Sequence, residues 1–511
     1  MKNIVKASGM TVLVAALIGC GSTGQRAAEN NGSHPQTAAS PQQAASESSA
    51  LSRTMQDASL PTPIPSRTDD MYFQNYGANP FVSAAEDRLS TFAADVDTGS
   101  YTVMRRYIHE GTLPPPDAVR VEEFINYFPV AYPAPTDRTF SIVTDGGPSP
   151  FHPGHQLVRI GIKGKEIASD DRKPARLVFV IDVSGSMARE NRLELVKKSL
   201  NVLVDQLQPD DTVGIVVYGS NGRVVLPPTS AKQRPAILSA IAELKPEGST
   251  NAEEGLLLGY ELASRSFERG AINRVILCSD GVANVGVTGA EGILRSIEDF
   301  SRKEIYLSTF GFGMGNYNDV LMEQLADKGE GNYAYIDSFS EAKRVFTEAL
   351  TGKLQTIARD VKIQVEFDPA KVDSYRLLGY ENRDVRDEDF RNDKTDAGEV
   401  GAGHTVTALY EIKPKKAADT APLGTVRIRH HDVATNRVEE TSQPVQVQTT
   451  LSPELKFLAS VAEFAEILRE SPWSERSSLH DVLELAKANA SGEEQREFVR
   501  LVENSLALRK H

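Results

Sequence analysis

Cysteine is scarce in this chain of 511 residues, which contains only Cys20 and Cys278. Two cysteines cannot build the framework of several disulfides that is typical of small secreted domains. Cys278 lies in the apolar run RVILCSDG. We therefore expect a buried and unreactive thiol at this position rather than a nucleophile.

The sequence also lacks a long basic stripe. Its 56 Lys and Arg residues are outnumbered by 70 Asp and Glu residues, which gives a formal net charge of -14. This acidic balance argues against a nucleic-acid partner and against direct binding to an anionic membrane surface. No P-loop, GxSxG, HExxH or Cys–His nucleophile pattern is present, so we expect a protein that is not an enzyme.

The hydrophobic run near the N-terminus is too short to span a bilayer permanently. The apolar stretch GMTVLVAALIG follows the basic stretch MKNIVK and precedes Cys20, an order typical of a secretory signal. LIGC resembles the lipobox of bacterial lipoproteins. This resemblance implies that residues 1–19 are a signal peptide and that Cys20 carries lipid. Because Gly21 replaces the aspartate that usually retains such proteins in the inner membrane, the outer membrane is favoured if the cell is Gram-negative.

The length predicts two to four domains, since a typical domain has about 150 residues. Residues 20–68 are rich in Ala, Ser, Gln, Asn and Pro, which predicts a disordered tether with a reach of roughly 35–40 Å. Five segments with globular patterning follow: a partly helical extension (70–135), a β segment (139–170), an α/β domain (176–353), a β-rich region (359–450) and a helical tail (452–510).

The α/β domain is predicted from apolar strands that alternate with amphipathic helices. This pattern favours a mostly parallel, Rossmann-like sheet with helices on both faces. The two or three strands in 139–167 are few for a sheet of their own. The strands of 359–450 could complete a β-sandwich with them, and the α/β domain would then be inserted into the sandwich; in the alternative arrangement the β segments only flank it.

Oxygen-bearing side chains follow three of the predicted strands or loops. Asp182, Ser184 and Ser186 come from DVSGS, Thr250 from EGSTN and Asp280 from CSDG. Ligands of open α/β sheets bind at the carboxyl ends of the strands, where these loops should meet. Because hard cations prefer oxygen ligands, the sequence predicts a site for Mg²⁺ at this edge.

This set of motifs resembles the metal-ion-dependent adhesion site of von Willebrand factor type A (vWA) domains. The resemblance implies that Ser184 and Ser186 bind the metal directly. Thr250 would bind directly or through water, and Asp182 and Asp280 mostly through water. The metal would be Mg²⁺, with Mn²⁺ or Ca²⁺ as alternatives. The stretches STFAADVDTGSYTVMRRYI, GAGHTVTALYEI and LRESPW further resemble the flanking regions of bacterial vWA lipoproteins.

A metal that is held mainly by hydroxyl groups keeps excess positive charge and an open coordination position. We therefore expect a membrane-anchored adhesion module of the cell envelope, which binds an Asp or Glu carboxylate of a protein or other envelope component through the metal. One alternative is a metal that only stiffens three loops, and another is a scaffold for assembling an envelope complex. A hydrolase is a further alternative, but it would need a Glu or His beside the metal.

Two other motifs are weaker. Asp95 and Asp97 in AADVDTGS are similar to the nucleophile loop of haloacid dehalogenase phosphatases, but we expect solvated carboxylates that cap the following helix. His152 and His155 in FHPGH could form a zinc pair. Because no further Cys or His lies nearby in the sequence, a loop between two strands is favoured.

Overall fold

The computed structural model describes residues 71–281, 289–315, 317–348, 352, 354–416 and 421–509. The predicted signal peptide (1–19), the lipidation site Cys20 and the predicted tether (20–68) lie outside these residues. None of the helices formed by the described residues has the length and apolar character needed to cross a membrane.

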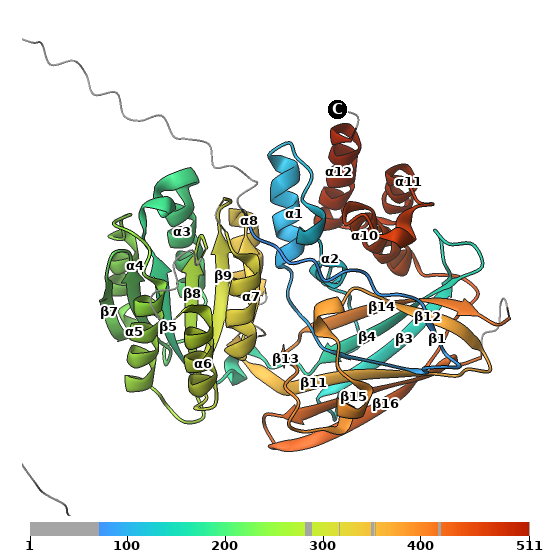
Figure 1. Cartoon of the computed structure of the whole chain (residues 1–511). Coiled ribbons are helices and arrows are strands. Elements are labelled where there is room, and N and C mark those ends of the chain that lie inside the picture. The colour runs from blue at the N-terminus through green and yellow to red at the C-terminus, as the bar shows by residue number, and fades with distance from the viewer. Residues whose placement is uncertain are drawn as a thin grey trace, which may run out of the picture. The chain divides into compact units, whose positions relative to one another are not determined.

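The α/β domain is built on a six-stranded sheet with the order β10-β9-β8-β5-β6-β7 (Figure 1). Its strands are β5 (Ala175–Asp182), β6 (Thr212–Tyr218), β7 (Gly222–Ser230), β8 (Ile272–Ser279), β9 (Tyr306–Phe312) and β10 (Tyr333–Ile336). All neighbouring strands are parallel except β6 and β7. The predicted mostly parallel sheet is therefore confirmed, although the antiparallel edge strand β7 was not expected.

Helices cover both faces of this sheet (Figure 1). One layer is α3 (Arg192–Asp205), α4 (Arg234–Ala242) and α8 (Phe339–Lys343), and the other is α5 (Ala252–Arg265), α6 (Gly289–Ser301) and α7 (Asp319–Lys328). Alternate residues of β5 enter the two cores, because side chains of a strand point to opposite faces in turn. Phe179 packs in the core with α3, and Val180 in the core with α5.

The strands outside the α/β domain form two antiparallel sheets that share one hydrophobic core. The first sheet contains β1 (Val82–Ser83), β12 (Val372–Leu378), β14 (Thr405–Pro414), β4 (Gln156–Gly164) and β3 (Phe140–Pro148). The second contains β13 (Gly398–Gly401), β11 (Thr356–Phe367), β15 (Gly424–Asp432) and β16 (Arg437–Val445), with β2 (Leu89–Ala93) also paired to β11.

The α/β domain is inserted into this β-sandwich. Strand β4 precedes the domain and β14 follows it, yet the two strands pair from Thr405 opposite Lys163 to Ile412 opposite Gln156. Of the two arrangements predicted from the sequence, insertion is therefore the one that the structure has.

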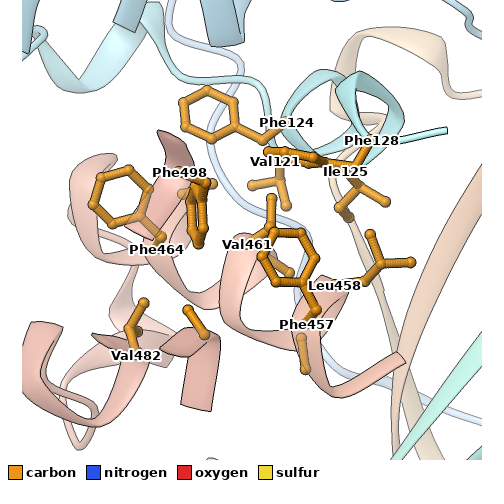
Figure 2. Packing of buried hydrophobic residues seen from close by; sticks show 14 of the residues in the cluster. Val121, Phe124, Ile125, Phe128, Phe457, Leu458, Val461, Phe464, Val482 and Phe498 are labelled. Carbon is orange, nitrogen blue, oxygen red and sulfur yellow. The ribbon is translucent and has the colours of Figure 1, made fainter. Parts of the chain in front are cut away.

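The N-terminal extension and the helical tail pack against each other. Extension helix α2 (Val121–Tyr127) contacts α10 (Pro453–Leu468), which is followed by α11 (Leu479–Asn489) and α12 (Glu493–Leu508). Figure 2 shows the aromatic centre of this contact, where the ring of Phe128 lies 5.1 Å from that of Phe457 and 5.7 Å from that of Phe498. Both pairs are edge-to-face, a geometry that stabilises aromatic clusters beyond simple burial.

Two expectations about single residues have different outcomes. Cys278 on β8 is fully buried, and burial raises the pKa of its thiol well above the usual range, so the expected burial is confirmed. The solvated caps expected at Asp95 and Asp97 are wrong. Both carboxylates are buried, at 5% and 4% exposure, and both face the guanidinium of Arg383, which also pairs with Glu323 and Asp327.

Helix α1 (Gly99–His109) joins the extension to the α/β domain through a buried ion cluster. Arg105 lies 2.6 Å from Asp337, just after β10, and 3.0 Å from Glu341 on α8. The same guanidinium donates to the Tyr127 hydroxyl on α2 and lies 3.3 Å from Glu497 on α12. One side chain therefore ties together the extension, the α/β domain and the helical tail.

We predict that Arg105→Met will lower the free energy of unfolding by about 3–5 kcal/mol, because Asp337 loses its counter-charge and buried Glu341 keeps only Arg344. Denaturant unfolding measures this loss. Arg302→Met is the matched control, since Arg302 pairs with carboxylates at the surface and its side chain is 65% exposed. The control should change stability by less than about 1 kcal/mol. Equal effects of the two substitutions would contradict this role of Arg105.

Candidate metal centre

The three predicted loops meet at the carboxyl edge of the sheet in the α/β domain. Asp182 is the last residue of β5, and Asp280 follows the end of β8 directly. These two strands are parallel neighbours, with Ile181 opposite Cys278, so their ends lie side by side. The chain leaves β5 toward β6 on one side and returns to β8 on the other, and such a reversal of strand order is where α/β sheets bind ligands.

Asp182 organises the base of the site. Its Oδ1 accepts a hydrogen bond of 2.8 Å from the Ser184 backbone N–H, and its Oδ2 accepts one of 3.0 Å from the Ser279 hydroxyl. The residue is fully buried. Burial, together with the charge of Asp280, raises the pKa of Asp182 to about 6. This carboxylate is therefore electrostatically poised to gain from a nearby cation.

The two serine hydroxyls connect this base to Asp280. The Oγ atoms of Ser184 and Ser186 are 2.9 Å apart, and the Ser186 hydroxyl donates to Asp280 Oδ1 at 3.1 Å. Neighbouring oxygens around an octahedral Mg²⁺ ion are also roughly 2.9 Å apart, given metal–oxygen distances of about 2.0–2.1 Å. The donors are hydroxyl and carboxylate oxygens alone, so their chemistry and spacing fit a hard cation.

Thr250 lies on the third loop and is half-buried at the rim of the site. This loop is held against the first by two backbone hydrogen bonds, from Gly185 N–H to Gly248 O (3.1 Å) and from Glu247 N–H to Val183 O (2.5 Å). The structure thus brings the loops of all five predicted residues together. Within the described residues, the hydrogen-bonded chain joins four of them directly and does not include Thr250.

The sequence analysis did not single out Arg192, which is the main cation of this site. Its Nη1 lies 2.6 Å from Asp280 Oδ2, and its Nη2 donates to the Met314 carbonyl oxygen. The side chain is 3% exposed. One signal could have identified it: Arg192 is the first residue of α3, where the helix dipole disfavours positive charge. An arginine at this position therefore indicates a nearby anion.

The oxygens of the site differ in their exposure to solvent. Asp182, Ser184 and Asp280 are buried, whereas Ser186 and Thr250 are partly accessible. The neighbouring stretches 188–190 and 245–249 are exposed. Among the described residues, the accessible side of these oxygens is therefore the side of Ser186 and Thr250.

We predict that Arg192→Met will lower the free energy of unfolding in EDTA by about 3–5 kcal/mol, because Asp280 then stays buried beside Asp182 without a cation. Thermal and denaturant unfolding measure this change, and added Mg²⁺ should recover more stability in the variant than in the wild type. Arg189→Met, an exposed position in the same loop, serves as the control and should have little effect. A variant as stable as wild type in EDTA would contradict the proposed compensation.

Comparison with protein families supports the domain assignment. The model for the von Willebrand factor type A domain matches residues 177–348, within the predicted range 176–353. A model described as von Willebrand factor matches residues 67–159, in the extension and the first β segment. A model described as uncharacterized protein YfbK, C-terminal, matches residues 352–423 and 413–508.

Curated relatives and solved structures were also compared. A protein from Synechocystis sp., sll0103, is 27% identical over 311 residues, which is 58% of this chain and 72% of the relative. A solved von Willebrand factor type A protein from Catenulispora acidiphila has a TM-score of 0.41 and 16% identity, covering 71% of this chain and 89% of that one.

The most informative of these relatives is the protein YfbK of Escherichia coli (strain K12). It is 37% identical over 468 residues, which cover 84% of this chain and 80% of the relative. The chain therefore belongs to the family of YfbK, with a von Willebrand factor type A domain followed by a YfbK-type C-terminal region.

Proposed function

We propose that this protein is a binding module that holds a divalent cation, Mg²⁺, at the carboxyl edge of its vWA domain and uses it to bind a carboxylate of a partner. The observation that carries this proposal is that Ser184, Ser186 and Asp280 converge on one point. The hydroxyl oxygens of Ser184 and Ser186 are 2.9 Å apart, and that of Ser186 is 3.1 Å from Asp280 Oδ1. When bound, the cation would supply a positive point of attachment for an anion.

The charge balance of the site supports an anionic partner. Asp182 and Asp280 together carry two negative charges, and Arg192 already compensates one of them. A bound divalent cation would therefore leave one positive charge in excess. A single Asp or Glu side chain of a partner would neutralise it, whereas a neutral ligand would not.

Access to the site supports a macromolecular partner that presents its carboxylate on a protruding loop or side chain. Of the donors that the resemblance places at the cation, Ser186 and Thr250 are on the accessible side. The exposed stretches around them would form the surrounding contact surface. We therefore favour a protein or another envelope component as the partner over a small metabolite.

We further propose that the folded part is held in the cell envelope by lipid on Cys20, with the segment 20–68 as a spacer. The motif LIGC, with the basic and apolar stretches before it, supports this proposal. Several acyl chains on one cysteine would give stable anchoring, whereas one chain alone gives only marginal membrane binding. Attachment to the outer membrane is favoured if the cell is Gram-negative.

We predict that an envelope partner will be captured by the wild-type protein in Mg²⁺ and released by EDTA, because the partner's carboxylate binds through the cation. Asp182→Ala should abolish the capture and Ser186→Ala should reduce it roughly tenfold or more, since each loses a group that holds the cation. Pull-down from cell-envelope extract, quantified by mass spectrometry, measures this difference.

The matched control is Ser239→Ala, which removes an exposed hydroxyl on α4 of the same domain. This variant should capture the partner as the wild type does. Circular dichroism of each variant checks that it is folded. Capture that is equal with Mg²⁺ and EDTA, and equal in all variants, would rule out binding through a metal.

A further inference from the structure

His152 and His155, which lie in the loop between β3 and β4, meet a carboxylate that is distant in the sequence. Glu411 is on β14, opposite Leu157 of β4, and this register places it beside the end of the loop. Its Oε1 lies 2.8 Å from His152 Nδ1 and also bonds His155 Nδ1. The three donor atoms lie within 4.8 Å of one another. The partner that the histidine pair lacks in the sequence is therefore supplied by the fold.

The hydrogen bonds of His152 require a positive charge in this cluster. Its Nε2 lies 3.1 Å from the carbonyl oxygen of Trp473, which can only accept, so Nε2 carries a proton. In a neutral ring the lone pair is then on Nδ1, which faces a carboxylate oxygen that also only accepts. Two lone pairs at 2.8 Å repel each other. A second proton between them removes this repulsion, whereas a Zn²⁺ ion bound by both atoms would hold them about 3.3 Å apart, slightly farther than they lie here.

Glu411 is firmly oriented from its other side. Its other oxygen, Oε2, lies 3.0 Å from the guanidinium of Arg376. The same guanidinium also lies 3.0 Å from the carboxylate of Glu466. The Trp473 carbonyl thus orients His152, and Arg376 orients Glu411. Metal ligands are typically oriented by such additional hydrogen bonds.

A further buried carboxylate lies beside this cluster. Glu463 of α10 is only 6% exposed, and its Oε1 has no hydrogen-bond partner among the described residues. It lines a cavity of about 20 Å³ together with His152 and Glu411. This volume holds one water-sized species, since roughly 10–15 Å³ is sufficient. A buried carboxylate oxygen without a partner costs free energy, and a cation in the cavity would offset this cost.

We propose that His152, His155 and Glu411, with Glu463 as the fourth donor, form a second metal site of this protein that binds Zn²⁺. Two imidazoles with carboxylates are a ligand set that suits zinc in tetrahedral coordination, whereas the oxygen-only site of the vWA domain suits Mg²⁺. The ion would connect the β3–β4 loop, β14 and α10. It would therefore fasten the β-sandwich to the helical tail, independently of partner binding at the vWA domain.

The test is zinc binding to the full chain, produced without a polyhistidine tag. Titration calorimetry with Zn²⁺ should show one site, and Zn²⁺ should raise the melting temperature. His152→Gln and His155→Gln should each weaken binding roughly tenfold or more. His480→Gln, at an exposed position on α11, and Asp182→Ala in the vWA domain should retain it. Bound Co²⁺ provides a second measurement, because tetrahedral coordination gives intense visible absorption that either histidine substitution should remove.

Two results would overturn the proposal. One is the absence of Zn²⁺ uptake by the wild-type chain, and the other is unchanged uptake in both histidine variants. In the first case a proton would supply the positive charge on His152. Contact with Glu411 raises the pKa of His152, although burial opposes this shift. The stability that the protonated His152 gains from Glu411 would therefore be lost as the pH rises through the raised pKa. Loss of zinc binding in Asp182→Ala as well would place the ion in the vWA domain and would also contradict the proposal.

Discussion

Two buried carboxylates at the end of parallel strands are the constraint around which the vWA domain is arranged. Because β5 and β8 are neighbours, Asp182 and Asp280 must meet at one edge of the sheet. At 0% and 5% exposure, little water screens their repulsion. The start of α3 supplies Arg192, and the loop before it supplies Ser184 and Ser186. Each of these features is explained by the need to place positive charge and polar hydrogens beside two acids.

The rest of the chain holds this edge in place. The vWA domain enters and leaves the β-sandwich between strands that pair with each other, so both of its ends are fixed to one frame. Arg105 adds a buried ion cluster between α1, the end of β10 and α8. The edge that carries the candidate metal site is therefore connected to the β-sandwich and the helical tail through paired strands and buried ion pairs.

The elements that the sequence predicted well are those with local signals. The run LVFVI followed by DVSGS identifies both a buried strand and its polar end. The helical tail predicted from residue 452 also begins there in the structure, where the Ser452 hydroxyl accepts a hydrogen bond from the Leu455 N–H. Asp280 was identified because its motif also follows an apolar strand. The parallel sheet then follows from strand order alone.

Features that depend on distant residues were missed for a physical reason. Asp95 and Asp97 look like solvated turn residues until Arg383, nearly 300 positions away, is brought against them. Glu411 has no sequence feature that connects it to His152, because only the pairing of β4 with β14 brings the two together. Local patterns predict strands and their ends, but they do not indicate which buried charge will compensate another.

Metal binding at the vWA domain can be observed directly by locating the bound ion. Mn²⁺ can replace Mg²⁺ in an oxygen site, and its anomalous scattering locates it in a crystal of the protein. The account predicts one peak within bonding distance of the hydroxyl oxygens of Ser184 and Ser186, beside Asp280. A map with no peak there at saturating Mn²⁺, or with a peak only at His152, would contradict it.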